Sequence, residues 1–212
     1  MSPRRALGLA CGDLYRNSWR LVPVNAMLGA VLVFAAVAAV AVHALLVLAV
    51  LAGPLAAALA HSSVTLVRTG NLVLADAWEG LRLHWRRGLA LGAAGLALGV
   101  LAGVAVHFYT RSTAGWPLAF VTLYLVVLLG IYAAVLTTVA VADPGLPIGV
   151  AAHEAAVLVA RRPGATVLIG LALLLVNLAG IAAAIMPFLT ITLAYSFVAV
   201  AHFVLPPEAR EV

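Results

Sequence analysis

Eight polar side chains interrupt long apolar stretches of this sequence, and their chemistry is hydrogen bonding. They are His61, Ser62, Ser63, Thr137, Thr138, Asn177, Tyr195 and Ser196. Hydroxyl, amide and imidazole groups can line a cavity and make weak contacts with a neutral polar solute. Serine and threonine in apolar helices also bond back to their own backbone, and histidine pairs with neighbouring helices. The eight residues therefore indicate either a cavity between helices or ordinary helix packing.

The sequence has no recognisable catalytic motif, and we predict that the protein is not an enzyme. It contains no His-Glu-x-x-His, no Gly-x-Ser-x-Gly and no Walker loop. All 12 basic residues are arginine, which excludes a lysine Schiff base. His43 and His107 are expected near one membrane face, but two ligands do not make a zinc site. We expect no metal and no cofactor.

Charged residues are scarce, and three times an acid is followed seven positions later by arginine. The residues are Asp13 with Arg20, Glu79 with Arg86 and Arg87, and Glu154 with Arg161 and Arg162. A spacing of seven is two helical turns, so acid and base share one helix face. Helices of this kind at a membrane boundary present their charges to lipid headgroups or to a partner protein. We predict one of these contacts for all eight residues.

Membrane-spanning helices must position these side chains. The chain has 212 residues, of which 66% are hydrophobic and 9% charged, and this is too apolar for a water-soluble domain. Uncharged runs cover residues 21–67, 88–110, 112–142 and 163–207. Because a span needs roughly 20 apolar residues, the first and last runs must fold back. We predict an all-α polytopic membrane helix bundle with about six transmembrane helices.

The predicted elements make up a single membrane domain, residues 1–212. Spans are expected at 22–43, 44–67, 89–109, 117–142, 165–185 and 187–205. Cytoplasmic interfacial helices are expected at 5–20, 72–87 and 147–162, and a tail at 206–212. The first turn between spans falls near His43, so Gly53 and Pro54 are expected to kink the second span rather than start it.

The arginines sort to one side of the membrane. With a cytoplasmic N-terminus, eleven of the 12 lie inside and only Arg111 lies outside, which is the positive-inside pattern. We therefore predict a multi-pass protein of the bacterial cytoplasmic (inner) membrane with both termini in the cytoplasm. The net charge of +5 then reflects orientation, and no nucleic-acid partner is expected.

An internal repeat emerges when the chain is shifted by 75 positions. Glu79 then falls on Glu154, Arg86 on Arg161, and the letters GLAL recur. We predict that residues 62–103 superpose on residues 137–178 as parallel hairpins. Because the scarce charged residues match without a gap, the match is more than shared apolar composition.

The repeat has two further consequences. A helix break is expected after each arginine pair, at Gly88 and at Pro163. A weaker third copy at the N-terminus predicts a quasi-threefold bundle ringed by three interfacial helices. At least one of Asp13, Glu79 and Glu154 is expected to pair with an arginine of another repeat.

Three stretches carry a resemblance to a known family. They are DLYRNSWRLVPVN at 13–25, GPLAAALAHSSVTLVRTG at 53–70 and ADAWEGLRLHWRRG at 75–88. In these stretches the chain resembles the YesL-like bacterial integral membrane proteins, including the early Asn25 and the Gly-Pro break before VTLVR. The resemblance implies a five- or six-span membrane protein, often encoded near sugar transporters and carbohydrate-degrading enzymes, with no established activity.

Two functions follow from these observations. The first is a noncatalytic accessory or partner-binding subunit associated with carbohydrate uptake or utilisation. Its expected partners are membrane lipids and a sugar ABC importer or another membrane protein. The alternative is a small channel or uncoupled carrier for a neutral polar solute. A continuous hydrated path would favour transport, whereas a dry core with an apolar outer face would favour the accessory role.

Overall fold

The fold is all-α. A computed structural model describes residues 2–183 and 185–205, and this part contains seven α-helices and no strand. The elements are α1 (Pro3–Ala41), η1 (His43–Leu51), α2 (Ala52–Thr69), α3 (Leu74–Tyr109), η2 (Thr113–Gly115), α4 (Trp116–Ala142), α5 (Ile148–Arg161), α6 (Pro163–Ala182), η3 (Phe188–Thr192) and α7 (Leu193–Val204). Of the short elements, η1 and η2 are 3₁₀ helices and η3 is a π-helical turn.

Five helical segments are long and apolar enough to cross a membrane. They are Pro3–Ala41, His43–Thr69, Leu74–Tyr109, Thr113–Ala142 and Pro163–Ala182. The chain is therefore a multi-pass membrane protein, and the prediction of an all-α membrane fold is confirmed. The predicted sixth span corresponds to a shorter apolar segment, Phe188–Val204. The predicted tail at 206–212 lies outside the described residues.

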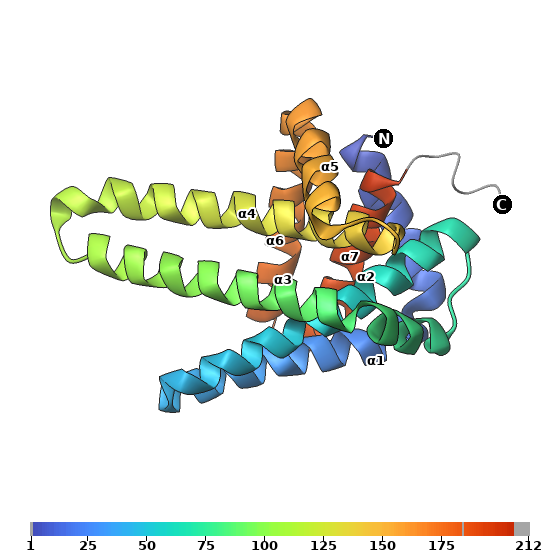
Figure 1. The fold of residues 1–212 in the computed structure, drawn as a ribbon, viewed down its shortest axis with the longest axis horizontal. Helices are drawn as coiled ribbons and strands as arrows, with labels where there is room; N and C mark the ends of the chain where they lie inside the picture. The colour runs from blue at the N-terminus through green and yellow to red at the C-terminus, as the bar shows by residue number, and fades with distance from the viewer. Residues whose placement is uncertain (1, 184, 206–212) are drawn as a thin grey trace.

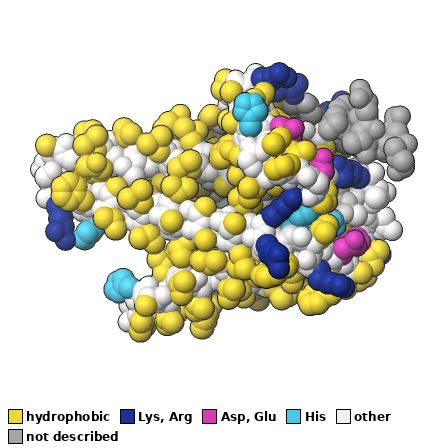
Figure 2. Space-filling view, viewed as in Figure 1, with side chains coloured by type: hydrophobic (Ala, Val, Ile, Leu, Met, Phe, Trp, Pro, Cys, Tyr) yellow, Lys and Arg dark blue, Asp and Glu magenta, His cyan; other side chains and the backbone are white. Residues whose placement is uncertain are grey.

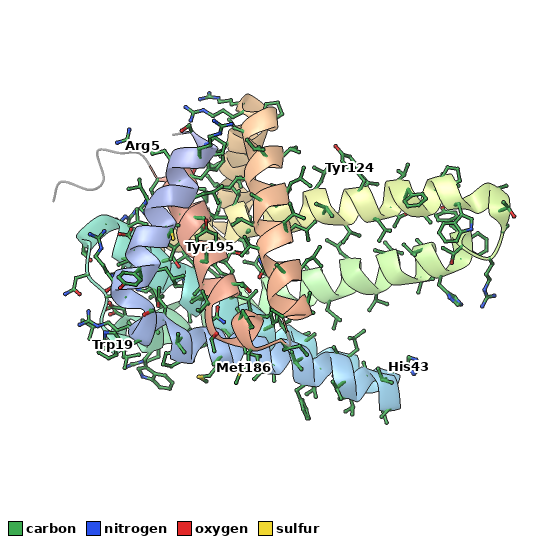
Figure 3. The ribbon with its side chains drawn as sticks, turned by 180° about the vertical axis from the view of Figure 1, so that it is seen from behind. Arg5, Trp19, His43, Tyr124, Met186 and Tyr195 are labelled. Atoms are coloured by element: carbon green, nitrogen blue, oxygen red, sulfur yellow. The ribbon has the colours of Figure 1, made fainter. Side chains whose placement is uncertain are left out.

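The helices run in two main directions (Figure 1). The α3–α4 hairpin projects from the rest of the molecule, and the later part of α1 runs with η1 and α2 in a similar direction. In contrast, α5, α6 and the beginning of α1 run across that direction (Figures 1 and 3). The beginning of α1 and the end of α7 lie on the same side. This arrangement differs from the three parallel hairpins that the repeat predicts.

The two halves of the repeat differ in shape because they carry different residues at one aligned position. Gly88 and Pro163 occupy equivalent positions, but α3 continues through Gly88 whereas the chain breaks at Arg162, which has φ −138° and ψ 57°. Proline disfavours the helical conformation of the residue before it and cannot donate a backbone hydrogen bond. The break expected at Gly88 was therefore wrong, and the interfacial helix and the span predicted there are one helix.

The first apolar run folds back close to the predicted position. Val42 has an extended backbone (φ −139°, ψ 104°) and ends α1, and η1 begins at His43. Figure 3 places His43 at the far tip of this hairpin. The 3₁₀ segment passes into α2 at Ala52, just before Gly53 and Pro54, without a turn of the chain. These two residues thus lie inside a continuous helical segment.

The first predicted interfacial helix is continuous with the first span, but it bends. Asn17 has non-helical backbone angles (φ −117°, ψ 15°) inside α1. Its side-chain Nδ2 donates to the carbonyl oxygen of Asp13 at 3.2 Å. The bend separates an N-terminal arm, residues 3–16, from the apolar remainder of α1. The name N-terminal arm is used below for these residues.

Glycine lets α2 and α3 pack backbone against backbone. A Cβ atom added at Gly53 would lie 2.0 Å from the carbonyl oxygen of Gly88, and one at Gly88 would lie 2.5 Å from Cα of Pro54. Gly92 also contacts this region, since a Cβ there would lie 2.5 Å from the carbonyl oxygen of Val50. Small residues of this kind allow close approach of membrane helices, where dispersion contacts and not burial from water hold helices together.

Replacing Gly88 with alanine should therefore destabilise the protein. The new methyl group would overlap the backbone at Pro54, and such overpacking costs about 1–3 kcal/mol. Gly99 on the same helix is the matched control, because a Cβ there meets nothing within 4 Å. We expect Gly88→Ala to lower the thermal unfolding midpoint in detergent and Gly99→Ala to leave it unchanged or raise it. Equal midpoints for the two variants would contradict the close packing of α2 on α3.

Candidate functional site

The serine and threonine hydroxyl groups of the predicted polar patch bond to the backbone of their own helical segments. Each donates to the carbonyl oxygen four residues earlier, over 2.7–3.0 Å. The donors are Ser62, Ser63, Thr137, Thr138 and Ser196. Ser62, Ser63 and Thr138 are fully buried. Hydroxyls bonded in this way do not offer a donor to a solute, so they do not form a polar path between the helices.

Asn177 and Ser196 come together across α6 and α7. Nδ2 of Asn177 donates to the hydroxyl oxygen of Ser196 at 2.7 Å and to the carbonyl oxygen of Leu173 at 2.8 Å. The side-chain oxygen of Asn177 is buried and has no hydrogen-bond partner. Both residues line a cavity of about 320 Å³ between α4, α6 and α7. Asn177 and Ser196 are thus two residues of the predicted patch that line the same cavity.

His61 lies apart from that pair, against His84 of α3. The ring centroids of the two histidines are 5.5 Å apart, and His84 is 1% exposed. Gly80 makes room for His61, because a Cβ there would lie 2.7 Å from Cβ of His61. Nδ1 of His61 and Nε2 of His84 are buried without a hydrogen-bond partner. No group of three His, Cys, Asp or Glu able to hold a metal ion is found among the described residues.

Tyr195 contacts a third region. Its hydroxyl donates to the carbonyl oxygen of Leu7 at 3.2 Å, which joins α7 to the N-terminal arm. Figure 3 shows Tyr195 in the middle of the helices that run across the α3–α4 hairpin. The eight polar residues therefore occupy separate places, because α2 and α4 on one side and α6 and α7 on the other present them to different neighbours.

The acidic residue of the N-terminal arm is paired, but not as the repeat predicts. Asp13 lies 2.8 Å from Nη2 of Arg16 on its own helix and 2.7 Å from Nε2 of His202 on α7. His202 is 3% exposed. Among the described residues, neither Glu79 nor Glu154 forms an ion pair. The predicted pairing of an acid with an arginine of another repeat was wrong, because the N-terminal arm packs on α7.

Arg20 ties α1 to the turn between α2 and α3. Its guanidinium donates to the side-chain oxygen of Asn71 and to the carbonyl oxygen of Leu72. The same group lies 4.7 Å from the ring centroid of Trp19. Arg20 is thus committed to contacts within the protein, although the sequence predicts a lipid or partner contact for it.

Arg87 binds the end of α4. Its guanidinium donates to the carbonyl oxygens of Ala140 at 3.0 Å, Pro144 at 2.7 Å and Leu146 at 2.9 Å. Arg68 adds a bond to the carbonyl oxygen of Ala142 at 3.1 Å. The last carbonyls of a helix lack partners within the helix and carry partial negative charge, so the two guanidinium groups satisfy and neutralise those of Ala140 and Ala142. The other two bonds of Arg87 hold the loop between α4 and α5.

Five of the predicted contact residues remain exposed and unpaired by hydrogen bonds or ion pairs within the described chain. They are Glu79, Arg86, Glu154, Arg161 and Arg162. The guanidinium group of Arg86 lies over the ring of Trp85, with its Cζ atom 5.2 Å from the ring centroid. Figure 2 shows hydrophobic side chains covering the α3–α4 hairpin, with charged groups at its tip and over the opposite part of the molecule.

Asn25 is an organising residue that the motif analysis does not single out as a site. It is fully buried, and its Nδ2 donates to the carbonyl oxygens of Phe188 at 2.9 Å and Leu189 at 2.7 Å. Its side-chain oxygen accepts from the backbone N–H of Ala194. These bonds hold the π-helical turn η3. The sequence could have indicated this role, because Asn25 places an amide near the start of a long apolar run and polar groups in a membrane require partners.

Comparison with protein-family models, with curated proteins and with solved structures gave no match for this chain.

Removing the positive charge at position 87 should destabilise the protein more than removing it at position 86. Arg87→Gln breaks up to three charge-assisted hydrogen bonds to the last turn of α4 and the loop after it, and we expect a loss of about 2 kcal/mol. Arg86→Gln is the matched control and should cost less than about 0.5 kcal/mol. Chemical unfolding in detergent measures both values. An equal loss in the two variants would show that the contacts of Arg87 contribute nothing specific.

Replacing Asn25 with leucine should loosen η3 and α7. The change leaves two carbonyl oxygens and one N–H without their partner, and each buried unsatisfied group costs about 1–3 kcal/mol. We expect faster hydrogen exchange in residues 188–204 than in the α2–α3 hairpin of the same variant. Unchanged exchange in residues 188–204 would contradict a structural role for Asn25.

Proposed function

We propose that the protein is a noncatalytic membrane subunit that binds another membrane protein through the outer half of α3. The observation that carries this proposal is the division of one glycine face into two parts. Gly88 and Gly92 are in contact with α2, whereas a Cβ at Gly95, Gly99 or Gly103 would meet nothing within 4 Å. Spacings of three and four residues place all five on one helix face.

The exposure of the hairpin supports the same role. None of the residues in the most apolar 18-residue window of α3 is buried, compared with 33% for the segment His43–Thr69. Glycines spaced four apart let a second transmembrane helix approach the backbone closely. The face is thus chemically equivalent to the one that already packs on α2, and a partner's helix would extend that packing.

Charge distribution gives the proposal an orientation. We place both termini in the cytoplasm of a bacterial inner membrane, with the short apolar segment Phe188–Val204 as the sixth crossing. Exposed Glu79, Glu154, Arg161 and Arg162 then serve as contacts to lipid headgroups or to the partner's cytoplasmic surface. The resemblance to YesL-like proteins supports a sugar ABC importer as the partner and a role in carbohydrate uptake.

The alternative function, a channel or uncoupled carrier for a neutral polar solute, has less support. A cavity of about 960 Å³ lies between α1, η1, α2, α3, α4 and α7, but its walls are almost entirely apolar. Among the described lining residues, Tyr132 and Thr137 carry hydroxyl groups, and both donate to backbone carbonyl oxygens, of Ala152 at 2.9 Å and of Ala133 at 2.7 Å. A polar solute would lose its hydration there without gaining new hydrogen bonds.

Site-specific photo-crosslinking in native membranes tests the partner-binding role. A photoreactive residue at Val106 shares the glycine face, and one at Leu101 lies on the opposite face of α3. We expect Val106 to capture a defined membrane protein and Leu101 to label lipid. Adding Gly99→Leu should abolish the protein adduct, whereas Gly149→Leu on α5, which also has open space at its Cβ, should not.

Two results would contradict the proposal. Lipid adducts alone at Val106 would mean that the glycine face is covered by lipid. Saturable release of a neutral sugar from proteoliposomes containing the purified protein would instead support the carrier function.

A further inference from the structure

The cavity between α4, α6 and α7 combines apolar walls with one unusual polar group. Its volume is about 320 Å³, within the size range of small-molecule sites. The walls include Ile131, Ile169, Leu173 and Phe197, and Asn177 and Ser196 are the polar side chains among the lining residues. None of the described residues that line it is charged. The walls therefore favour an uncharged, mainly hydrocarbon occupant.

The hydrogen bonds around Asn177 leave one acceptor unfilled. Its Nδ2 group donates twice, to Leu173 and to Ser196. The hydroxyl of Ser196 accepts one of these bonds and donates its own hydrogen to the carbonyl oxygen of Thr192 at 2.8 Å. The side-chain oxygen of Asn177 is buried and has no donor. Buried polar atoms are nearly always hydrogen-bonded, so this oxygen indicates a missing donor.

The local geometry also fixes which end of the amide is available. Because both hydrogens of Nδ2 have acceptors, turning the amide over would place Oδ1 against the carbonyl oxygen of Leu173 and lose that bond, and Ser196 could bond to the turned amide only by giving up its bond to Thr192. The group that fills the site must therefore donate a hydrogen bond. A ketone, an ether or an ester without a hydroxyl cannot do so.

We propose that this cavity binds an apolar molecule that carries one hydroxyl group. The hydrocarbon part lies against the aliphatic and aromatic walls. Because Oδ1 of Asn177 is buried, the side chains beside it move as the hydroxyl comes within hydrogen-bond distance and donates to it. A long-chain alcohol has this chemistry, as does a lipid with a single free hydroxyl, and both reach the cavity from the bilayer. The site is separate from the glycine face of α3 and does not depend on partner binding.

Photolabelling with a matched pair of probes tests the site. The probes are a diazirine-bearing long-chain primary alcohol and its methyl ether, which has the same chain but no donor. With the full-length protein in detergent, we expect the alcohol to label peptides of α4, α6 or α7 and to bind about fivefold more tightly than the ether. Fivefold is the effect of one net hydrogen bond between neutral groups.

Asn177→Leu keeps a side chain of similar size and removes the acceptor. We expect alcohol binding to fall to the level of the ether in this variant, while ether binding stays as it is in the unaltered protein. Equal binding of alcohol and ether to the unaltered protein would overturn the proposal. Unchanged alcohol binding to the Asn177→Leu variant would overturn it too.

A second variant guards against misfolding of the first. Gly130 lies on the cavity wall, and a Cβ there meets nothing within 4 Å, so Gly130→Leu can occupy the space without a steric conflict. We expect it to reduce labelling by both probes at least fivefold. Gly149→Leu on α5, which does not line the cavity, should leave labelling unchanged. Undiminished labelling of the Gly130→Leu variant would show that the probes bind elsewhere.

Discussion

Backbone groups freed where a helix ends or bends need hydrogen-bond partners, which water can supply at a membrane surface but only the protein can supply in the core of a bilayer. The most connected polar side chains of the molecule meet this need. Arg87 binds the last turn of α4 and the loop after it, Asn25 binds the π-helical turn η3, and Asn17 binds the carbonyl of Asp13 at the bend of α1. The first two join segments far apart in the sequence, so satisfying the backbone also fixes the tertiary arrangement.

The close packing of α2 on α3 depends on glycines, which have no Cβ atom. Glycine at 53, 88 and 92 brings the backbones of α2 and α3 into direct contact. The same face of α3 continues through Gly95, Gly99 and Gly103, which line the large apolar cavity and where an added Cβ would meet nothing within 4 Å. Because lipid is as apolar as the helix, hydrophobicity alone does not favour binding of another helix to this face. A partner helix would instead be recognised by how closely its shape fits the glycine face.

Hydrogen bonding within each helix limits the chemistry of the interior. Four hydroxyls donate to backbone carbonyls of their own helices, those of Ser62, Ser63, Thr137 and Thr138. These bonds allow polar residues in apolar helices without creating a hydrated path. Asn177 differs because its amide has more bonding capacity than its surroundings use. An amide oxygen without a hydrogen-bond donor, beside an apolar cavity, favours a ligand that has a hydrocarbon chain and one hydrogen-bond donor.

Composition and hydropathy determined the class of this protein and most of its helix boundaries. The start of α4 at Trp116 and the all-α membrane fold follow from the length of apolar runs, which is a local and additive property. The turn at Val42 follows from aligning the first apolar run with Trp116 across the repeat. The repeat in the sequence did not determine the shape of its two halves. A glycine in one and a proline in the other give a continuous helix at Gly88 and a break at Arg162.

Only the tertiary structure decided the partners of the polar residues. Arg86 and Arg87 are identical and adjacent in sequence, yet one is exposed over Trp85 and the other binds the end of α4. Likewise, Asp13 meets His202 across 189 positions of sequence, and Asn25 meets Ala194 across 169. Sequence spacing specifies which residues share a helix face, but the neighbour of that face depends on how the helices cross. For hydrogen bonds, whose strength depends on distance and direction, that neighbour decides the role of the residue.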